Sequence, residues 1–507
     1  MPPIKGLELI ILTVAVSLGI FMNVLDTSIA NVAIPSIAGD LAVSPDEGTW
    51  VITSFTVSMA IVLPLTGWLG RRFGEVRLFV ISTALFTITS VLCGLSTNLA
   101  SLIFFRVLQG AVAGPMIPLS QSLLLENYPE DKKGLAMALW ATVAVAAPVL
   151  GPILGGYITD NLQWPWIFYI NLPVGIGSVI ATWFILRKRE TSISKQPIDF
   201  VGLILLAAGV GCLQVLLDRG KDLDWFNSSF ITLLACISAI SICSLLIWES
   251  TEKNPILDLA LFKQRNFTIG TIALSLGFGT YFGTVVILPL WLQTQMGYTP
   301  TWAGVTTATL GILPVIVSPW MGAIMNKVDL RYLTSLGFFV FAACSVWIGC
   351  FNTNVSAGDV ALARFIQGFG APFFFIPTLS ILLSKIPNHE LASAAGLSNF
   401  LRILMGSFGT SISVTAWDRR ERLHQSQIVE QITSYSPNLQ SVVQKLQDQG
   451  FPLPASYATV HEWAINQSYM LATNDIFLFC SGIFLFLMFL IWLTRPPFLV
   501  KSAAAVG

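Results

Sequence analysis

The 507-residue chain is poor in charged side chains. Asp, Glu, Lys and Arg make up 11% of it, whereas soluble proteins carry about a quarter, and hydrophobic residues make up 54%. The formal net charge is zero, so no global field indicates a nucleic acid or another polyanion as a partner. A chain of this composition has lipid as the solvent of most of its surface, which predicts a protein with many membrane spans.

Signatures of metal binding, nucleotide hydrolysis and covalent catalysis are also lacking. The seven cysteines are odd in number, form no CxxC pair and fall in apolar stretches, so we interpret them as small hydrophobic residues. The only Gly-Lys pair, Gly220-Lys221, is followed by Asp222, which excludes a GxxxxGK[ST] phosphate-binding loop. The three histidines lie in predicted loops, so no metal site is expected in the membrane. We therefore expect no metal, no cofactor and no direct use of ATP.

Apolar segments recur along the whole chain. A helix needs about 20 apolar residues to cross the hydrocarbon, and polar turns separate the crossings. This rule predicts fourteen spans, of which the seventh, 201–217, and the eighth, 230–248, have the weakest signals. The first apolar run, 9–35, is too long for a cleaved signal peptide and is predicted to be a span. With the N-terminus inside, most Lys and Arg residues fall in cytoplasmic loops, as the positive-inside rule requires.

One motif occurs twice. The segment RVLQG at 106–110 reappears as RFIQG at 364–368, 258 positions later. The repeat predicts two parallel six-helix halves, 1–190 and 266–507, separated by two inserted membrane helices with their linkers in 191–265. Transporters built from such repeats bind their substrate near the midplane, between the halves.

Four segments carry a resemblance to a known family. The segment LDTSIANVAIP at 25–35 resembles the LDxTIxNVALP signature of the fourteen-span drug:proton antiporters. Three more resemble motifs of the major facilitator superfamily: GWLGRRFG at 67–74 in the loop after the second helix, FRVLQG at 105–110 in the fourth helix, and PVLGPILGG at 148–156 in the fifth helix, which is typical of antiporters. The chain resembles the EmrB/QacA group of this superfamily over nearly its full length.

The resemblance implies an all-α membrane protein with the major facilitator fold and fourteen transmembrane helices. It implies proton-driven efflux of hydrophobic small molecules, such as drugs, uncouplers or fatty acids, across the bacterial inner membrane, with both termini cytoplasmic. It also implies an EmrA-like periplasmic adaptor and a TolC-like outer-membrane channel as partners. The loop 418–473, with a helix-like stretch at 442–446, would dock the adaptor or serve as a solvated connector.

Asp26 is the only carboxylate well inside an apolar span. Placing such a charge near the bilayer centre costs about 2.5 to 3.5 kcal/mol, so these residues usually face a cavity and have a function. We predict that Asp26 carries the proton, and the resemblance places Arg106 of the fourth span beside it. The alternatives are an Asp that pairs structurally with a neighbouring helix and an Arg that braces backbone carbonyls. Arg364 repeats Arg106, yet the ninth span has no acid, so coupling is expected to be asymmetric.

The predicted substrate cavity combines a polar stripe on the first span with residues of both halves. In the thirteenth span, Arg402 is a further buried cation, which either braces the halves or meets an anionic ligand. The phenylalanine run 373–375 either lines the cavity or serves in helix packing and lipid contact. The predicted cavity residues are Asn23, Thr27, Asn31, Gln109, Gln367, Phe374 and Arg402.

Glycine and proline concentrate in the loop and fifth-helix motifs. The family motifs imply hinge and gating roles, whereas glycine and proline are frequent in membrane helices in any case. The loop motif has Gly70 where the family usually has Asp, so a gating contact from that carboxylate is not implied here. The predicted hinge and gating residues are Gly67, Arg71, Gly74, Pro148, Gly151, Pro152, Gly155 and Gly156.

Uptake, enzymatic activity and channel activity are the alternatives to efflux. Proton-coupled uptake stays open, because only the antiporter-like fifth-helix motif argues against it. A membrane-embedded enzyme is less expected, since no Ser/His/Asp grouping or HExxH motif lies in or beside the spans. A channel is disfavoured by the single buried acid.

Overall fold

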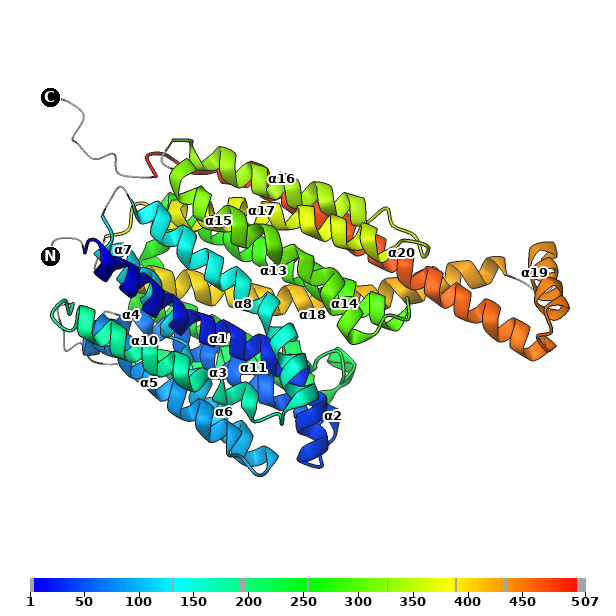
Figure 1. The fold of residues 1–507 in the computed structure, drawn as a ribbon, viewed down its shortest axis with the longest axis horizontal. Helices are drawn as coiled ribbons and strands as arrows, with labels where there is room; N and C mark the ends of the chain where they lie inside the picture. The colour runs from blue at the N-terminus through cyan, green and yellow to red at the C-terminus, as the bar shows by residue number, and fades with distance from the viewer. Residues whose placement is uncertain are drawn as a thin grey trace.

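The computed structural model describes residues 4–129, 132–191, 193, 197, 199–252, 255–325, 327–387, 390–432 and 436–498, and within this part all regular elements are helices (Figure 1). The N-terminal half contains α1 (Leu7–Asp40), α2 (Pro45–Gly48), α3 (Trp50–Val62), η1 (Leu63–Leu65), α4 (Thr66–Phe73), α5 (Glu75–Gly94), α6 (Leu99–Ala113), α7 (Met116–Asn127), α8 (Lys133–Asn161), α9 (Trp166–Tyr169) and α10 (Asn171–Leu186). The inserted segment contains α11 (Phe200–Arg219), η3 (Trp225–Asn227), α12 (Ser229–Thr251) and η4 (Leu259–Lys263). The C-terminal half contains α13 (Arg265–Thr294), α14 (Pro300–Ala308), η5 (Thr309–Gly311), α15 (Ile312–Ile324), α16 (Leu330–Ile348), α17 (Ala357–Leu383), α18 (Leu391–Gln431), α19 (Pro437–Asp448), α20 (Leu453–Leu490) and η7 (Ile491–Leu493).

The helices account for the fourteen predicted spans. Within the described residues, 12 helical segments are long and apolar enough to cross a membrane, and they include the weakly signalled α11 and α12. The other two are α8, with 29 residues, and α18, with 41. Both pack inside the bundle, α8 against α1 and α18 against α13. The all-α fold with fourteen membrane helices is confirmed.

The sequence repeat is also a structural repeat. Three pairs of helices begin 258 positions apart: α1 and α13 at Leu7 and Arg265, α6 and α17 at Leu99 and Ala357, and α8 and α18 at Lys133 and Leu391. Each half therefore places equivalent helices around its own core.

The helix caps follow the same repeat. Asn98 accepts a hydrogen bond from the Ser101 backbone at the start of α6, and Ser356 accepts one from the Asp359 backbone at the start of α17. Such side chains satisfy backbone donors that the first helical turn leaves free.

The bundle has two distinct ends, which Figure 1 shows on the left and on the right. We call the left end the basic end: it holds the last turn of α4 with Arg71 and Arg72, the start of α8 at Lys133 and the end of α10, where Arg187 is the C-cap. At the other end α18 and α20 project beyond the remaining helices, with α19 at the tip, and we call residues 418–475 the hairpin.

The hairpin differs from the prediction of a loop between spans that end at 417 and begin at 476. Both membrane helices continue without a break, because no glycine or proline interrupts the sequence from 418 to 432 and α20 begins only at Leu453. At the base of the hairpin, Asp475 of α20 accepts a hydrogen bond from Arg420 Nε of α18 at 2.7 Å and lies 2.7 Å from His424 Nε2. The apolar-run criterion detects lipid contact rather than helix length, so it missed these extensions. The predicted helix-like stretch at 442–446 lies within α19.

The two halves meet most closely at the basic end. There the first turns of α18 pack against η1 and α4, and α15 packs against α8. Toward the hairpin end, α3 and α18 barely contact each other. The inserted helix α11 lies against both α3 and α18 there. Gln214 Nε2 of α11 donates to Ser407 Oγ at 2.8 Å, and Arg219 Nη1 donates to Thr49 Oγ1 at 3.0 Å. The structure thus shows a state closed at the basic end, with an inserted helix bridging the halves beyond it.

Each half is held together by a close contact at a glycine. A Cβ atom at Gly151 of α8 would overlap Ser28 of α1, and one at Gly409, 258 positions later, would overlap the Gly279 backbone of α13. Gly156, also in α8, has no atom within 4 Å of such a Cβ.

Gly151→Ala is expected to lower stability by about 1 to 3 kcal/mol, because the added methyl group overpacks the α1–α8 contact. Gly156→Ala, five residues along the same helix, is expected to be neutral or to stabilise by up to about 1 kcal/mol, since alanine favours the helix. Thermal unfolding of the two purified variants checks this, and equal unfolding temperatures would contradict the assigned contact.

Candidate functional site

Asp26 of α1 is enclosed by helices of the N-terminal half. Its Oδ2 forms an ion pair with Arg106 Nη1 of α6, and both side chains are 0% exposed. Its Oδ1 accepts hydrogen bonds from Gln109 Nε2 at 3.2 Å and from Asn171 Nδ2 of α10 at 3.3 Å. The structure therefore brings the two residues predicted for proton coupling into direct contact, and it satisfies both carboxylate oxygens.

Arg106 is held from several sides. Its Nε donates to the Val51 carbonyl of α3 at 2.9 Å, and its Nη1 also donates to Gln109 Oε1 at 2.8 Å. The guanidinium carbon lies 4.2 Å from the centre of the Phe55 ring and 5.6 Å from that of Phe168. Arg106 thus both pairs with the acid and braces a backbone carbonyl, so the two interpretations weighed for it coexist in one geometry.

Neutralising Asp26 would disturb this arrangement. Arg106 would then be a buried cation without its counter-ion, which is costly in a low-dielectric interior. Nη2 of Arg106 already lacks a hydrogen-bond partner among the described residues. With a neutral Asp26, Arg106 would need other hydrogen-bond partners or water in place of this carboxylate.

Several residues of this network were not predicted from the sequence. Asn171 also donates to Ser90 Oγ of α5 at 3.0 Å, and Ser90 donates to the Phe168 carbonyl at 2.9 Å. An amide near the start of the otherwise apolar sixth span was a signal for Asn171. Phe55 and Phe168 gave no signal, because their contact with Arg106 depends on tertiary packing alone.

The duplicate site in the C-terminal half has the arginine and the glutamine but not the acid. Arg364 Nη1 donates to Gln367 Oε1 at 2.7 Å, and Nη2 donates to the Thr284 carbonyl of α13. Thr284 stands 258 positions after Asp26, at the equivalent place. Among the described residues Arg364 forms no ion pair. The two halves therefore share a scaffold and differ in charge.

The polar stripe of α1 runs from the protein interior to an exposed position. Asn23 is buried and its Nδ2 donates to the Ala113 carbonyl at 2.9 Å. Thr27 is half-buried and donates to the Asn23 carbonyl at 3.4 Å, and exposed Asn31 donates to the Thr27 carbonyl at 3.0 Å. A wet path along this stripe stays a prediction.

The predicted cavity residues of the C-terminal half lie in two places. Gln367 is enclosed with Arg364, and Phe374 is buried in an aromatic cluster, its ring centre 5.0 Å from that of Phe338. Arg402 of α18 lies at the edge of this cluster, 4.5 Å from the Phe278 ring centre and 5.8 Å from that of Phe375. The rings beside the cation are thus those of Phe278 and Phe375.

The loop-motif residues lie at the closed basic end. A Cβ atom at Gly67 of α4 would come 2.7 Å from Ser393 Cβ of α18, so this glycine permits the close approach of the halves. Gly74 has φ +86° and links α4 to α5, and a side chain there would overlap Glu190. The Glu190 carboxylate accepts hydrogen bonds at 3.0 Å from the Val76 and Arg77 backbones. Arg71 is half-buried, and its Nε has no hydrogen-bond partner among the described residues.

The fifth-helix motif lies within the continuous helix α8. Gly151 contacts α1 of the same half and Gly155 is buried. The side chains of Pro148 and Pro152 lie outside the described part of the structure. The Gly151 contact packs two helices of one half, and a hinge between halves stays a prediction.

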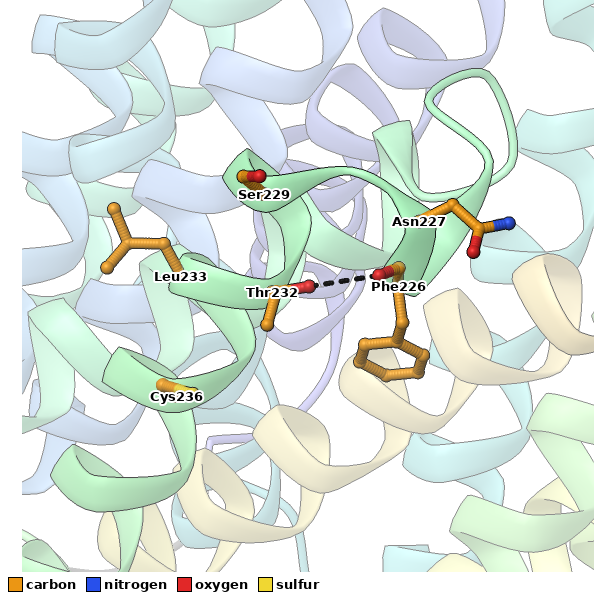
Figure 2. Close-up of a pocket in the computed structure, with 6 residues that line it drawn as sticks. All are labelled: Phe226, Asn227, Ser229, Thr232, Leu233 and Cys236. Carbon is orange, nitrogen blue, oxygen red and sulfur yellow. Dashed lines mark hydrogen bonds between the residues drawn. The ribbon is translucent and has the colours of Figure 1, made fainter.

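A shallow pocket of about 400 Å³ lies at the junction of η3 and α12. Figure 2 shows its lining and the hydrogen bond at 3.2 Å from Thr232 Oγ1 to the Phe226 carbonyl. Phe226 and Leu233 are exposed, and none of the lining residues belongs to the Asp26 or Arg402 surroundings. We assign the chemistry to the buried charges and not to this surface depression.

Comparison with known proteins agrees with this architecture. The family model described as Major Facilitator Superfamily matches residues 16–410. The chain belongs to this superfamily. Multidrug export protein EmrB of Escherichia coli strain K12 is 50% identical over 497 residues, covering 98% of this chain and 97% of that protein. Fatty acid resistance protein FarB of Neisseria gonorrhoeae is 48% identical over 497 residues, covering 98% of each.

Solved structures of the superfamily share the fold. The human organic anion transporter MFSD10 matches with a TM-score of 0.60 at 13% identity, covering 96% of this chain and 100% of that one. The proton:xylose symporter XylE matches with a TM-score of 0.56, also at 13% identity, covering 94% and 95%.

Gly67→Ala is expected to lower the transport rate about tenfold or more, because its methyl group would meet the Ser393 side chain and backbone and hold the basic end open. Gly70→Ala on the same helix is the matched control, since its Cβ would come 3.3 Å from the flexible Glu75 side chain. Maleimide labelling of a Ser393→Cys protein in each background reports the opening. Unchanged labelling in the Gly67→Ala background would contradict the assigned contact.

Proposed function

We propose that the protein exports hydrophobic small molecules in exchange for protons, by alternating access across the bacterial inner membrane. The observation that carries this proposal is the enclosed Asp26–Arg106 ion pair in one half of a duplicated scaffold whose other half lacks the acid. The names of the similar proteins, multidrug export protein and fatty acid resistance protein, support export as the direction.

The packing of the helices offers a route from the proton site to the gate. α1 packs along α8 and α6 packs along α3, and the basic ends of the spans that contain α8 and α3 meet the C-terminal half. When a proton neutralises Asp26, the buried Arg106 loses its counter-charge and the α1–α6 contact loosens. The movement of α1 and α6 then reaches the closed interface by two routes. One is the packing of α8 against α15, and the other is the packing of η1 and α4 against α18.

The distribution of basic residues supports the orientation. The basic end carries Lys and Arg residues on several short loops, which supports a cytoplasmic location for this end and for both termini. The state described here is then closed to the cytoplasm. The energy supply is sufficient, because one proton crossing about 150 mV yields about 3.5 kcal/mol, which supports a gradient of a few hundredfold in a neutral substrate.

Asp26→Asn is expected to reduce substrate-induced proton flux in reconstituted vesicles about a hundredfold, to background, since the amide does not carry a proton. Asp40→Asn is the matched control on the same helix, because Asp40 only accepts a hydrogen bond from Trp164 Nε1 at 2.8 Å, and it should retain most of the flux. Full proton-coupled transport by Asp26→Asn would refute the proposal, and substrate accumulation inside right-side-out vesicles would indicate uptake instead.

We further propose that the hairpin docks an EmrA-like periplasmic adaptor, which leads to a TolC-like outer-membrane channel. Several large apolar side chains of the hairpin have no cover in the described structure: Leu453, Tyr457 and Trp463 are each more than two-fifths exposed. Leu453 and Tyr457 are four residues apart and lie on one face of α20. Exposed apolar groups that project beyond the membrane helices are typical of a protein interface.

Tyr457→Asp combined with Trp463→Asp is expected to reduce co-purification of the adaptor at least tenfold, because two charges enter an apolar contact. Proton-coupled transport in vesicles without the adaptor should stay unchanged, since the hairpin is remote from Asp26. Glu462→Gln, at an exposed polar position between the two, is the control. Undiminished co-purification of the double variant would exclude this surface as the docking site.

A further inference from the structure

Arg402 is the one buried arginine of the described residues that belongs to neither copy of the repeated motif. The position 258 residues earlier is Ala144, so the N-terminal half has no equivalent cation. Arg402 is 8% exposed, and its Nε donates to Asn399 Oδ1 at 3.2 Å. Within the described residues it forms no ion pair.

The free part of this guanidinium is its outer edge. Nη1 and Nη2 donate to no acceptor among the described residues, yet neither is sealed off, in contrast to Nη2 of Arg106. Phe278 and Phe375 lie against the cation, 4.5 Å and 5.8 Å away. Aromatic faces stabilise a cation only in part, so a buried arginine with two open donor groups favours an anion beside it.

The location is the contact between the two halves. Asn399, which orients Arg402, also donates through Nδ2 to Gln121 Oε1 of α7 at 3.0 Å, a bond from one half to the other. Ile403, the next residue, packs against the N-terminal cluster that contains Phe55. Phe55 is the ring on which Arg106 rests, so packing connects the surroundings of Arg402 to the Asp26–Arg106 pair.

We propose that Arg402 binds the acidic head group of an anionic amphiphile, whose apolar part lies along Phe278 and Phe375. Arginine presents parallel N–H donors that match the two oxygens of a carboxylate, and the rings offer the apolar surface beside them. This inference rests on the proposed function: it names the residue of the same transporter that recognises an acidic head group, and it assigns the proton to one half and the substrate charge to the other.

The test compares two ligands that differ only in their head group. Calorimetric titration of the full-length protein in lipid nanodiscs measures decanoate against decanol, without a proton gradient. We expect the wild type to prefer decanoate about tenfold or more, and Arg402→Gln to bring the ratio of the two affinities close to one. Arg402→Lys keeps the positive charge but lacks the parallel N–H donors of the guanidinium, so it should retain part of the preference for decanoate over decanol.

Two controls keep the result interpretable. Arg420→Gln removes one positive charge from the same helix at the hairpin base and should leave the ratio unchanged, which excludes a general field effect. Decanol titration reports folding, because a collapsed site binds neither ligand. A decanoate preference that survives in Arg402→Gln, or that Arg420→Gln abolishes equally, would overturn the assignment.

The outcome is separable from that of the proposed function. If wild-type vesicles show no proton-coupled export of any substrate, the exporter proposal fails while the ratio of affinities still decides the role of Arg402. If export is proton-coupled and the ratio of the decanoate and decanol affinities does not depend on Arg402, only the role proposed for Arg402 fails.

Discussion

The structure depends on one constraint: a carboxylate held away from water must have a cation and hydrogen-bond donors around it. Asp26 meets this constraint with Arg106, Gln109 and Asn171, which come from two helices other than its own. Arg106 in turn requires the Val51 carbonyl and the Phe55 ring. One pair of charges thus links α1, α3, α6 and α10, and adding a proton to that pair would change the contacts that these helices must supply.

The duplicated scaffold has diverged at its charges while its packing has been kept. Helix starts and caps recur 258 positions apart, and so do Gly151 and Gly409, each of which contacts the first helix of its own half. At the position of Asp26 the second half has Thr284, and at the position of Arg402 the first half has Ala144. Under the proposed function, the proton and the charge of the substrate would therefore bind in different halves of one scaffold.

Much of the fold was predictable, because hydrophobic length and the repeat depend on local sequence. The span count, the two inserted helices and the approach of Arg106 to Asp26 all follow from runs of residues or from motifs. The hairpin was not predicted, since a helix that leaves the lipid loses its apolar signal while its backbone continues. The contact of Phe375 with Arg402 was also not predicted, because neighbours on a helix point in different directions and only tertiary packing decides which ring meets the cation. Asn171 is an intermediate case: the sequence shows a polar residue in an apolar span, but it does not show that Asp26 is its partner.

The helix α18 links three features that were described separately. It holds Ser393 at the basic-end contact, Arg402 in the membrane and Arg420 at the base of the hairpin, in a single element of 41 residues. At 1.5 Å per residue it is about 60 Å long. An unbroken helix of this length acts as a lever. When it tilts about a point near its basic end, the far tip moves several times farther than the residues at the basic end. A protein seated on that tip would therefore sense mechanically which face of the transporter is open.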